Sequence, residues 1–262
     1  MDFSDIIYEK SERIATVTFN RPDRMNAWTP RMDEELRNAM CDADGDPETR
    51  VIIVTGAGRA FCAGQDLGDR AVAPGGKLDL GASIEEYYAP LVRSLRALPL
   101  PVVCAVNGVA AGAGANLALA CDLVLAAHSA VFYEPFCMLG LVPDTGGTWV
   151  LPRLVGTARA MGLALLGDKL PAEQAAAWGL IWRALPDAEL MPAVEALVAR
   201  LAKAPTRGLA RTKQAIYAAA DNTLDDQLEV ERDFQRELGN SADYQEGVAA
   251  FLAKRPPQFQ GR

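Results

Sequence analysis

The first two thirds of the chain alternate short apolar runs with amphipathic stretches. Apolar runs bounded by Gly, Pro and polar residues predict strands at Ile6–Glu9, Ile14–Phe19, Val51–Thr55, Val102–Val106, Leu123–Ala127 and Val131–Tyr133. Helical periodicity lies between them, at Thr29–Cys41, Ile84–Ala97, Gly112–Cys121 and Trp149–Leu154. This alternation predicts a layered α/β core whose parallel strands are joined by right-handed crossovers.

From Thr157 onward the pattern is almost entirely helical. The expected helices are Thr157–Leu166, Pro171–Trp178, Leu190–Lys203, Thr206–Ala219, Leu224–Leu238 and Ala242–Ala253, with one strand at Ile181–Ala184. The composition shifts near residue 200. We therefore expect an α/β core over residues 1–200 and a helical section over residues 201–262.

Charge and composition narrow the partners that this chain would bind. The net charge is −8 and no basic run stands out, which disfavours nucleic acid and anionic membranes. We expect no signal peptide at the N-terminus and no apolar run long enough to cross a bilayer. The five cysteines form no C-x-x-C pair, so free thiols in a reducing cytoplasm are expected.

Histidine chemistry is scarce in this sequence. His128 is the one histidine, which excludes His-rich metal sites and disfavours Ser–His and Cys–His catalysis. No metal site is expected. If the protein catalyses proton transfer, carboxylates are the expected acids and bases.

Two Gly-rich turns follow two of the apolar runs. Ala63-Gly64 follows the run Val51–Thr55, and Gly112-Ala113-Gly114 follows the run Val102–Val106. Small residues let a ligand approach backbone N–H groups closely, so one amide from each turn could bind the same carbonyl oxygen. A role limited to tight turns and close helix packing fits the same pattern. Neither turn is followed by the acidic residue of a dinucleotide-binding fingerprint.

Four motifs, in order and at matching spacing, resemble the enoyl-CoA hydratase/isomerase (crotonase) family. They are Asn20-Arg21-Pro22-x-x-x-Asn26-Ala27, Ala60-Phe61-Cys62-Ala63-Gly64-x-Asp66-Leu67, Ala105-Val-Asn107-Gly108 through Cys121-Asp122, and Gly140-Leu-x-Pro-x-x-Gly146-Gly147-Thr148. The resemblance covers essentially the whole chain. Within the family, Gly140–Trp149 and Ser241–Phe259 are most similar to isomerases that act on ring-epoxidised phenylacetyl-CoA.

The resemblance implies a spiral of ββα units with a C-terminal helical trimerisation region. The assembly would be a homotrimer or a dimer of trimers. The implied substrate is an acyl-CoA thioester, and no separate cofactor is implied. The N–H groups of Ala63 and Ala113 would hold the thioester oxygen as an enolate forms, one such donor being worth about 3 kcal/mol of barrier.

The resemblance also implies which residues bind the two parts of the substrate. The acyl pocket would include Phe136 and Tyr87. Coenzyme A would contact Arg24, Ala27, Gln65, Asp66, Leu67 and Lys254, the last of these from this chain or a neighbouring subunit.

The acid and base positions depart from those of the family's hydratases. Hydratases of the family use two glutamates, and the matching positions here hold Asn116 and Phe136, neither of which can act as a base. Asp144 matches the aspartate that serves as the base in isomerases of the family. Locally, however, Pro-Asp-Thr-Gly-Gly also fits a helix N-cap, a role that would lower the pKa of Asp144.

Two further polar residues keep two interpretations each. Glu134 is either an exposed loop-end residue or a displaced acid or base. Asn116 is either a hydrogen-bond donor to a substrate oxygen or a helix-packing residue.

The leading hypothesis is a cofactor-independent isomerase that converts the ring epoxide of phenylacetyl-CoA to its oxepin form. Asp144 could also shift the double bond of a 3-enoyl-CoA. The alternatives are an enoyl-CoA hydratase that uses Glu134, a hydrolase-like enzyme with Asp144 as the nucleophile, and a non-catalytic CoA-binding scaffold. The identity of the acyl group stays open.

Overall fold

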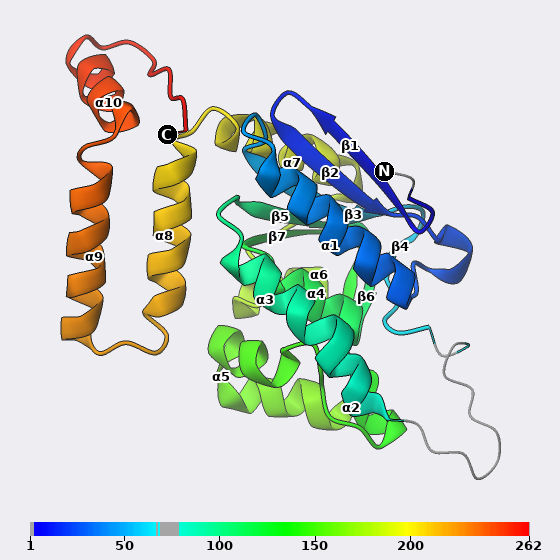
Figure 1. Cartoon of the computed structure of the whole chain (residues 1–262). Helices are drawn as coiled ribbons and strands as arrows, with labels where there is room; N and C mark the ends of the chain where they lie inside the picture. Colours follow the sequence, from blue (N-terminus) through cyan, green and yellow to red (C-terminus); the bar gives the residue numbers. More distant parts are fainter. Residues whose placement is uncertain (1–2, 67, 69–78, 262) are drawn as a thin grey trace.

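The computed structural model describes residues 3–66, 68 and 79–261, and their strands form two sheets (Figure 1). The larger sheet has the order β1-β2-β3-β5-β7-β10, in which only β1 and β2 pair antiparallel. Its strands are β1 (Ile6–Ser11), β2 (Ile14–Phe19), β3 (Val51–Gly56), β5 (Val102–Val106), β7 (Leu123–Ala127) and β10 (Arg183–Leu185).

The smaller sheet has the order β4-β6-β8-β9, with β4, β6 and β8 parallel and β9 antiparallel to β8. Its strands are β4 (Ala60–Cys62), β6 (Val109–Ala111), β8 (Val131–Tyr133) and β9 (Lys169–Pro171). Each of β3, β5 and β7 is followed by one short strand of this sheet and then by helix. This repeated ββα unit confirms the predicted spiral fold.

Ten α-helices in the described part of the chain follow these strands. They are α1 (Pro30–Gly45), α2 (Leu80–Ser83), α3 (Ala89–Ala97), α4 (Ala113–Ala120), α5 (Gly147–Leu166), α6 (Ala172–Trp178), α7 (Asp187–Leu201), α8 (Thr206–Ala218), α9 (Leu224–Leu238) and α10 (Ala242–Leu252). Three shorter helical segments are η1 (Pro22–Arg24), the π-helical turn η3 (Ile84–Tyr88) and η4 (Pro135–Leu139). The Thr29 side chain caps α1 by accepting from the Met32 amide, as expected of a Thr-Pro helix start.

Some predicted boundaries are wrong for local reasons. The sequence pattern predicts none of the strands β4, β6 and β9, which span three residues each, and it places Pro171 of β9 in the following helix. The single helix predicted at Ile84–Ala97 begins at Leu80 and contains the π-helical turn η3.

Helix α5 joins two segments that were predicted as separate helices. The join is not continuous, because Gly156 has non-helical backbone angles (φ 77°, ψ 160°). Among the described residues, α5 is the one helix long and apolar enough to cross a membrane by length and composition. The break at Gly156 divides its 20 residues, and neither part reaches the roughly 20 residues that a span needs.

Helix α4 lies entirely inside the protein. All eight of its residues are buried, because each is small or apolar apart from Asn116. The helix begins directly after β6, and α7 packs on the far strands β3, β5 and β7. The N-terminus of α4 therefore lies at the end of the smaller sheet, where the helix packs against β4, β6, α3 and α5.

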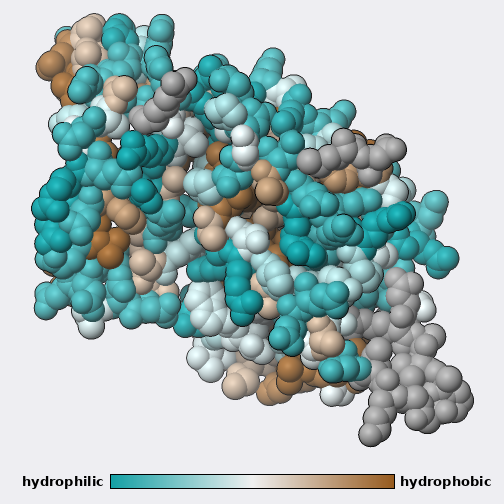
Figure 2. Space-filling model, viewed as in Figure 1, coloured by the Kyte–Doolittle hydropathy of each residue, from teal (hydrophilic) through white to brown (hydrophobic). Residues whose placement is uncertain are grey.

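Helices α8, α9 and α10 form an arm that stands away from the core (Figure 1). Lys213 of α8, 8% exposed, anchors the arm by donating to Leu95 O at 3.0 Å and pairing with Asp122 at 2.9 Å. The Tyr217 hydroxyl donates to the other oxygen of Asp122 at 2.6 Å. Large apolar side chains stay exposed on the arm, including Phe251 at 83%, and Figure 2 shows apolar patches over it.

Candidate active site

The two Gly-rich turns predicted to converge are in contact. Strands β4 and β6 are neighbours, with Cys62 opposite Ala110, so the turns after them leave the sheet side by side. A methyl group on Gly64 (φ 88°) would lie 2.8 Å from the Ala111 carbonyl oxygen and 3.9 Å from the Ala113 nitrogen. Only a glycine fits here, because the turn must approach the start of α4 this closely.

Ala113 is the first residue of α4, preceded by the N-cap Gly112. The Gly112 amide donates to Tyr133 O at 2.8 Å, and the Gly112 carbonyl accepts from the Asn116 amide at 3.0 Å. A helix's first N–H groups have no acceptor within the helix and carry the positive end of its dipole. The Ala113 amide is thus placed as an oxyanion donor would be.

The expectation for Ala63 needs correction. Its amide donates to the Met25 carbonyl at 3.0 Å, so a substrate oxygen would have to displace that bond. The backbone of the next residue, Gly64, lies near the Cys62 thiol and partly offsets the rise in the pKa of Cys62 that burial causes. Residue Gln65 forms a parallel bridge with Trp28, whose backbone bonds to Gly64 O and to the Asp66 amide. This pattern directs the Gln65 N–H to the side opposite Trp28.

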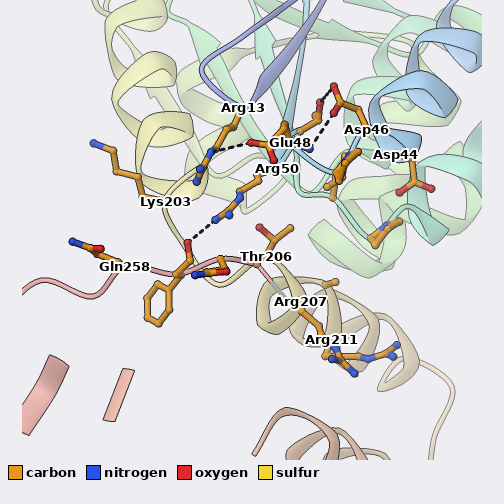
Figure 3. Close-up of a pocket in the computed structure, with 18 of the residues that line it drawn as sticks. Arg13, Asp44, Asp46, Glu48, Arg50, Lys203, Thr206, Arg207, Arg211 and Gln258 are labelled. Carbon is orange, nitrogen blue, oxygen red and sulfur yellow. Dashed lines mark hydrogen bonds and ion pairs between the residues drawn. The ribbon is translucent and has the colours of Figure 1, made fainter. Parts of the chain in front are cut away.

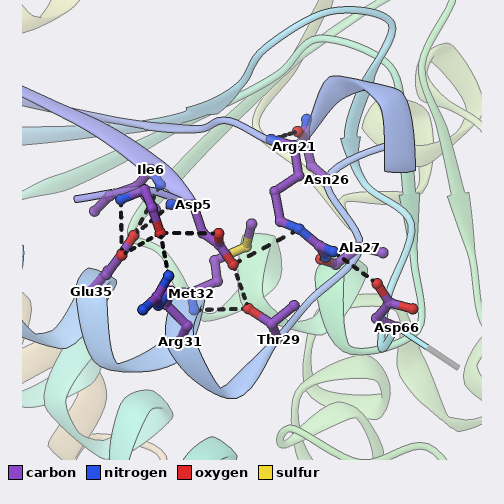
Figure 4. A network of polar contacts seen from close by, with 11 residues as sticks. Asp5, Ile6, Arg21, Asn26, Ala27, Thr29, Arg31, Met32, Glu35 and Asp66 are labelled. Atoms are coloured by element: carbon purple, nitrogen blue, oxygen red, sulfur yellow. Dashed lines mark hydrogen bonds and ion pairs between the residues drawn. The ribbon is translucent and has the colours of Figure 1, made fainter. Parts of the chain in front are cut away.

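Arg21 holds the two loops expected to bind coenzyme A (Figure 4). Its guanidinium donates to the Ala27 carbonyl at 2.5 Å and to the Asp66 carboxylate at 3.0 Å. The Asp66 carboxylate also accepts from the Gly68 amide, and these contacts lower the pKa of Asp66. The sequence motif Asn-Arg-Pro contains Arg21 but does not reveal that its side chain links these two loops.

The remaining residues expected at the coenzyme lie in different surroundings. Arg24 is exposed on η1, close enough to Asp66 to lower its pKa further. Leu67 lies outside the described residues. Lys254 follows α10, which lies across the molecule from the first turn of α1 (Figure 1). Within one chain, Lys254 is therefore not brought to the loop that carries Ala27.

Tyr88, rather than Tyr87, faces the Gln65 turn. The Tyr88 side chain is 2% exposed, packs near Trp28 and hydrogen-bonds to the Gln65 side chain. Tyr87 is half-buried, bonds to Glu86 and lies near Asp33 of α1, and these carboxylates raise its pKa. The π-helical turn adds one residue to the helix and shifts its facing side, which a 3.6-residue period cannot anticipate.

Asp144, Asn116 and Glu134 lie together at the start of α4 and α5. The Asn116 side-chain nitrogen donates to the Glu134 carboxyl at 3.2 Å and to the Asp144 carbonyl at 3.0 Å. A methyl group on Gly147, the first residue of α5, would lie 2.4 Å from the same nitrogen. Three segments distant in sequence thus meet at Asn116, which is fully buried.

The N-cap interpretation of Asp144 is wrong. The N-cap of α5 is Gly146, and the cap has no side-chain hydrogen bond. The half-buried Asp144 carboxylate instead accepts from the Thr145 hydroxyl at 2.8 Å. Gly146, and not Asp144, therefore occupies the cap position that the pattern assigned to Asp144.

Glu134 is buried, so the interpretation of an exposed loop-end residue is wrong. Its side chain lies at the start of η4, directly after β8, and is 3% exposed. Burial, together with the nearby Asp144 carboxylate, raises the pKa of Glu134 to about 8 despite the hydrogen bond from Asn116. Glu134 therefore keeps its proton at neutral pH.

Phe136 packs against the turn that opens α4. Its ring lies 3.5 Å from where a methyl group on Gly112 would be, and its side chain is 8% exposed. This position beside Ala113 fits a wall of the acyl pocket, while the role itself stays a prediction.

A separate cleft of about 980 Å³ lies between the arm and the core (Figure 3). Cations and carboxylates both line it, among them Arg13, Arg50, Arg207, Asp46 and Glu48. None of the expected site residues lines this cleft. Over residues 3–66, 68 and 79–261, no three His, Cys, Asp or Glu side chains gather where they could hold a metal ion.

Comparison with known proteins shows the family to which this chain belongs. Residues 9–262 match the family described as enoyl-CoA hydratase/isomerase. The chain is 55% identical over 258 residues to "1,2-epoxyphenylacetyl-CoA isomerase" of Escherichia coli K12, with 98% of each chain covered. It is 52% identical over 262 residues to "Probable enoyl-CoA hydratase" of Rhodobacter capsulatus, with 100% of both covered.

Solved structures show the same fold. "Enoyl-CoA Hydrates Subunit I" from Geobacillus kaustophilus aligns with a TM-score of 0.93 at 35% identity, covering 100% of both chains. "1.8 Angstrom Resolution Crystal Structure of Enoyl-CoA Hydratase from Bacillus anthracis" gives a TM-score of 0.93 at 30% identity, covering 99% of this chain and 100% of that one. The chain therefore belongs to the enoyl-CoA hydratase/isomerase family of acyl-CoA enzymes.

Proposed function

We propose that this chain is a cofactor-independent isomerase that converts a ring-epoxidised phenylacetyl-CoA thioester to its seven-membered oxepin form. The observation that carries the proposal is the position of Asp144. Its backbone carbonyl accepts a hydrogen bond from Asn116 of α4, the helix that begins at Ala113, while the two hydratase positions hold Asn116 and Phe136. The Escherichia coli relative is named for an isomerase of this substrate class.

In the proposed reaction the thioester oxygen accepts hydrogen bonds from the backbone N–H groups of Ala113 and Gln65. The Asp144 carboxylate removes a proton from Cα, and the electron pair moves to the thioester as an enolate. The carbon–carbon bond shared by the ring and the epoxide then opens to the oxepin. A proton returns to a ring carbon, so product and substrate have the same composition.

The same groups would shift the double bond of a 3-enoyl-CoA into conjugation with the thioester. One carboxylate beside an oxyanion site suffices for both reactions, because each passes through a thioester enolate. A broader isomerase and a dedicated epoxide isomerase thus share this site.

An enoyl-CoA hydratase is the second candidate, and the buried Glu134 carboxyl favours it. Hydration needs an acid or base in addition to Asp144, and Glu134 lies at the same cluster. The Rhodobacter capsulatus relative carries a hydratase name. Mass spectrometry of the product separates the two functions, because hydration makes a product one water heavier and isomerisation leaves the mass unchanged.

The test is to incubate the purified enzyme with the ring-epoxide thioester and with a 3-enoyl-CoA, and to measure the product masses by mass spectrometry. Products of unchanged mass from either substrate support the isomerase, and the more efficient substrate identifies the acyl group. A product one water heavier from a 2-enoyl-CoA, formed at a higher kcat/KM than either isomerisation, would replace the proposal with the hydratase.

We further propose that the enzyme works in the cytoplasm as a homotrimer or a dimer of trimers. The exposed apolar side chains of the arm support assembly, because contiguous apolar surface of this kind marks protein interfaces. A neighbouring subunit would then bring Lys254 to the coenzyme that Arg24, Ala27, Gln65, Asp66 and Leu67 contact. Coenzyme A is part of the substrate in this scheme.

A further inference from the structure

The position of Glu134 follows from the register of the smaller sheet. Tyr133 of β8 pairs with Ala111 of β6, and the next amide of that chain, Gly112, donates to Tyr133 O at 2.8 Å. Parallel strands release their chains at the same edge, so Glu134 leaves β8 where Gly112 and Ala113 open α4. The carboxyl of Glu134 is thus built into the edge that holds the expected oxyanion donor.

Asn116 ties this carboxyl to the Asp144 segment. Its nitrogen donates to Glu134 Oε2 at 3.2 Å and to the Asp144 carbonyl at 3.0 Å, so both of its N–H groups are used. Its oxygen Oδ1 is buried and has no hydrogen-bond partner within the described chain. A buried acceptor without a partner is destabilising, and a bound group that carries a proton would satisfy it.

The charges around Glu134 are of one sign. Burial is the main cause of its raised pKa, the Asp144 carboxylate adds to it, and the Asn116 hydrogen bond opposes it. No Lys, Arg or His of the described chain contributes a neutralising charge to Glu134. When two neighbouring carboxyl groups lie in different surroundings, their pKa values differ, so that one group keeps its proton and the other is free to accept one.

We propose that Glu134 is a second catalytic group of this site, which donates a proton to the substrate while Asp144 removes one. The proposal rests on the isomerase function above. Asn116 is a positioning residue, since it holds Glu134 beside the Asp144 segment. The family's pattern of two hydratase glutamates does not include position 134.

The two-carboxyl reaction differs from a single-base shuttle in where its protons come from. Asp144 breaks the Cα–H bond, and the electron pair enters the enolate. The O–H bond of Glu134 breaks, and its proton forms the new C–H bond at the far end of the conjugated system. The enzyme is left with Asp144 protonated and Glu134 ionised, and the starting state is restored when Asp144 loses its proton to water and Glu134 takes one up from water.

Deuterium labelling distinguishes the two schemes. The probe is a 3-enoyl-CoA with both Cα hydrogens replaced by deuterium, converted in ordinary water, with the product read by mass spectrometry. If Glu134 donates, the wild-type product keeps one deuterium, because the returning proton comes from Glu134. If Asp144 alone shuttles, much of the product keeps both.

Glu134→Gln removes the acid and keeps the shape and the oxygen that accepts from Asn116. We expect kcat to fall by about 100-fold, in the range of general acid–base contributions, and the remaining product to keep both deuteriums. We also expect wild-type activity to fall above about pH 8, where Glu134 ionises, and the variant to lack this limb. Glu231→Gln on the exposed face of α9 is the matched control and should behave as wild type.

Circular dichroism confirms that the variant folds. A Glu134→Gln enzyme with wild-type kcat, label pattern and pH profile would overturn the role of Glu134 and leave the isomerase intact. A wild-type enzyme that isomerises neither this probe nor the ring epoxide would overturn the proposed function, and the role of Glu134 would fall with it.

Discussion

The side-chain nitrogen of Asn116 donates to the Glu134 carboxyl at 3.2 Å, deep inside the protein. This contact joins α4 to the segment after β8. Each of these two parts of the chain supplies residues to the expected active site. It also explains why a helix made of small apolar residues carries one amide at its centre. The contact therefore fixes the local structure, while burial keeps Glu134 protonated despite the opposing effect of the Asn116 hydrogen bond.

Glu134 makes stability depend on pH with a defined sign. Its folded pKa is about 8, above the ordinary value of 4.5, so the native state binds the proton more tightly than the unfolded state. The stability that this proton provides is present at acid pH and is lost as pH rises from about 4.5 through 8. We expect Glu134→Gln to match wild type near pH 4 and to be more stable by roughly 5 kcal/mol at pH 9.

Urea unfolding at a fixed protein concentration, from pH 4 to pH 9, measures this difference. Because Asn116 can donate to the amide oxygen of the introduced glutamine as it does to Glu134, the comparison isolates the charge. Parallel stability curves for the two proteins across this pH range would show that Glu134 has an ordinary pKa.

Gly64→Ala should separate the two turns that carry the proposed oxyanion site. The new methyl group would lie 2.8 Å from the Ala111 carbonyl, and alanine is strained at φ 88°. We expect kcat to fall by about 100-fold, as when one oxyanion donor is removed. Gly45→Ala is the control, since nothing lies within 4 Å of its added methyl group. Equal steady-state rates for the two variants would refute the contact between the turns.

Lys213→Met tests how the arm is anchored to the core. The substitution removes the cation that pairs with Asp122 and leaves that carboxylate with the Tyr217 hydroxyl and the Val102 amide. Breaking a largely buried pair by removing one partner costs about 3 kcal/mol. Urea unfolding should show this loss, while Lys203→Met at an exposed position should change stability little. A loss no larger than that of the control would mean that packing, rather than the ion pair, holds α8.

Phe251→Glu tests assembly through the arm. Phe251 is 83% exposed in the single chain, so a buried position in the assembly would not tolerate the charge. We expect sedimentation to show smaller species than the wild type. Gln245→Glu adds the same charge to the same helix at another exposed position and serves as the control. A wild-type protein that sediments as a monomer would contradict the proposed trimer directly.

The fold could be predicted from the sequence because its long strands and its motifs are both local signals. β2, β5, β7 and β8 begin and end at the predicted residues, since apolar β-branched runs with sharp polar ends define them. Strand β8 has three residues as well, but its apolar and aromatic run gives a local signal. The three-residue strands β4, β6 and β9 lack such a signal and could not be predicted, because they form through pairing across the smaller sheet. The family resemblance supplied the spiral that these local patterns do not show.

The site was predicted less completely, for reasons that depend on tertiary contacts. The Ala113 amide lies at the start of a helix that the sequence already indicated. The hydrogen bond from the Ala63 amide to the Met25 carbonyl depends on how the loops pack. The orientation of Tyr88 toward the Gln65 turn depends on the π-helical turn. The burial of Glu134 depends on its sheet register and on Asn116, which lies 18 residues away.

The most direct test of the account is the kcat of Asp144→Asn for isomerisation of a 3-enoyl-CoA and of the ring-epoxide thioester, followed by ultraviolet absorbance. Asparagine keeps the size of the side chain and cannot accept the Cα proton. The account predicts a fall of at least about 100-fold with intact folding, and no change for Asp225→Asn on the exposed surface of α9. Wild-type rates for Asp144→Asn on these substrates would show that another group is the base.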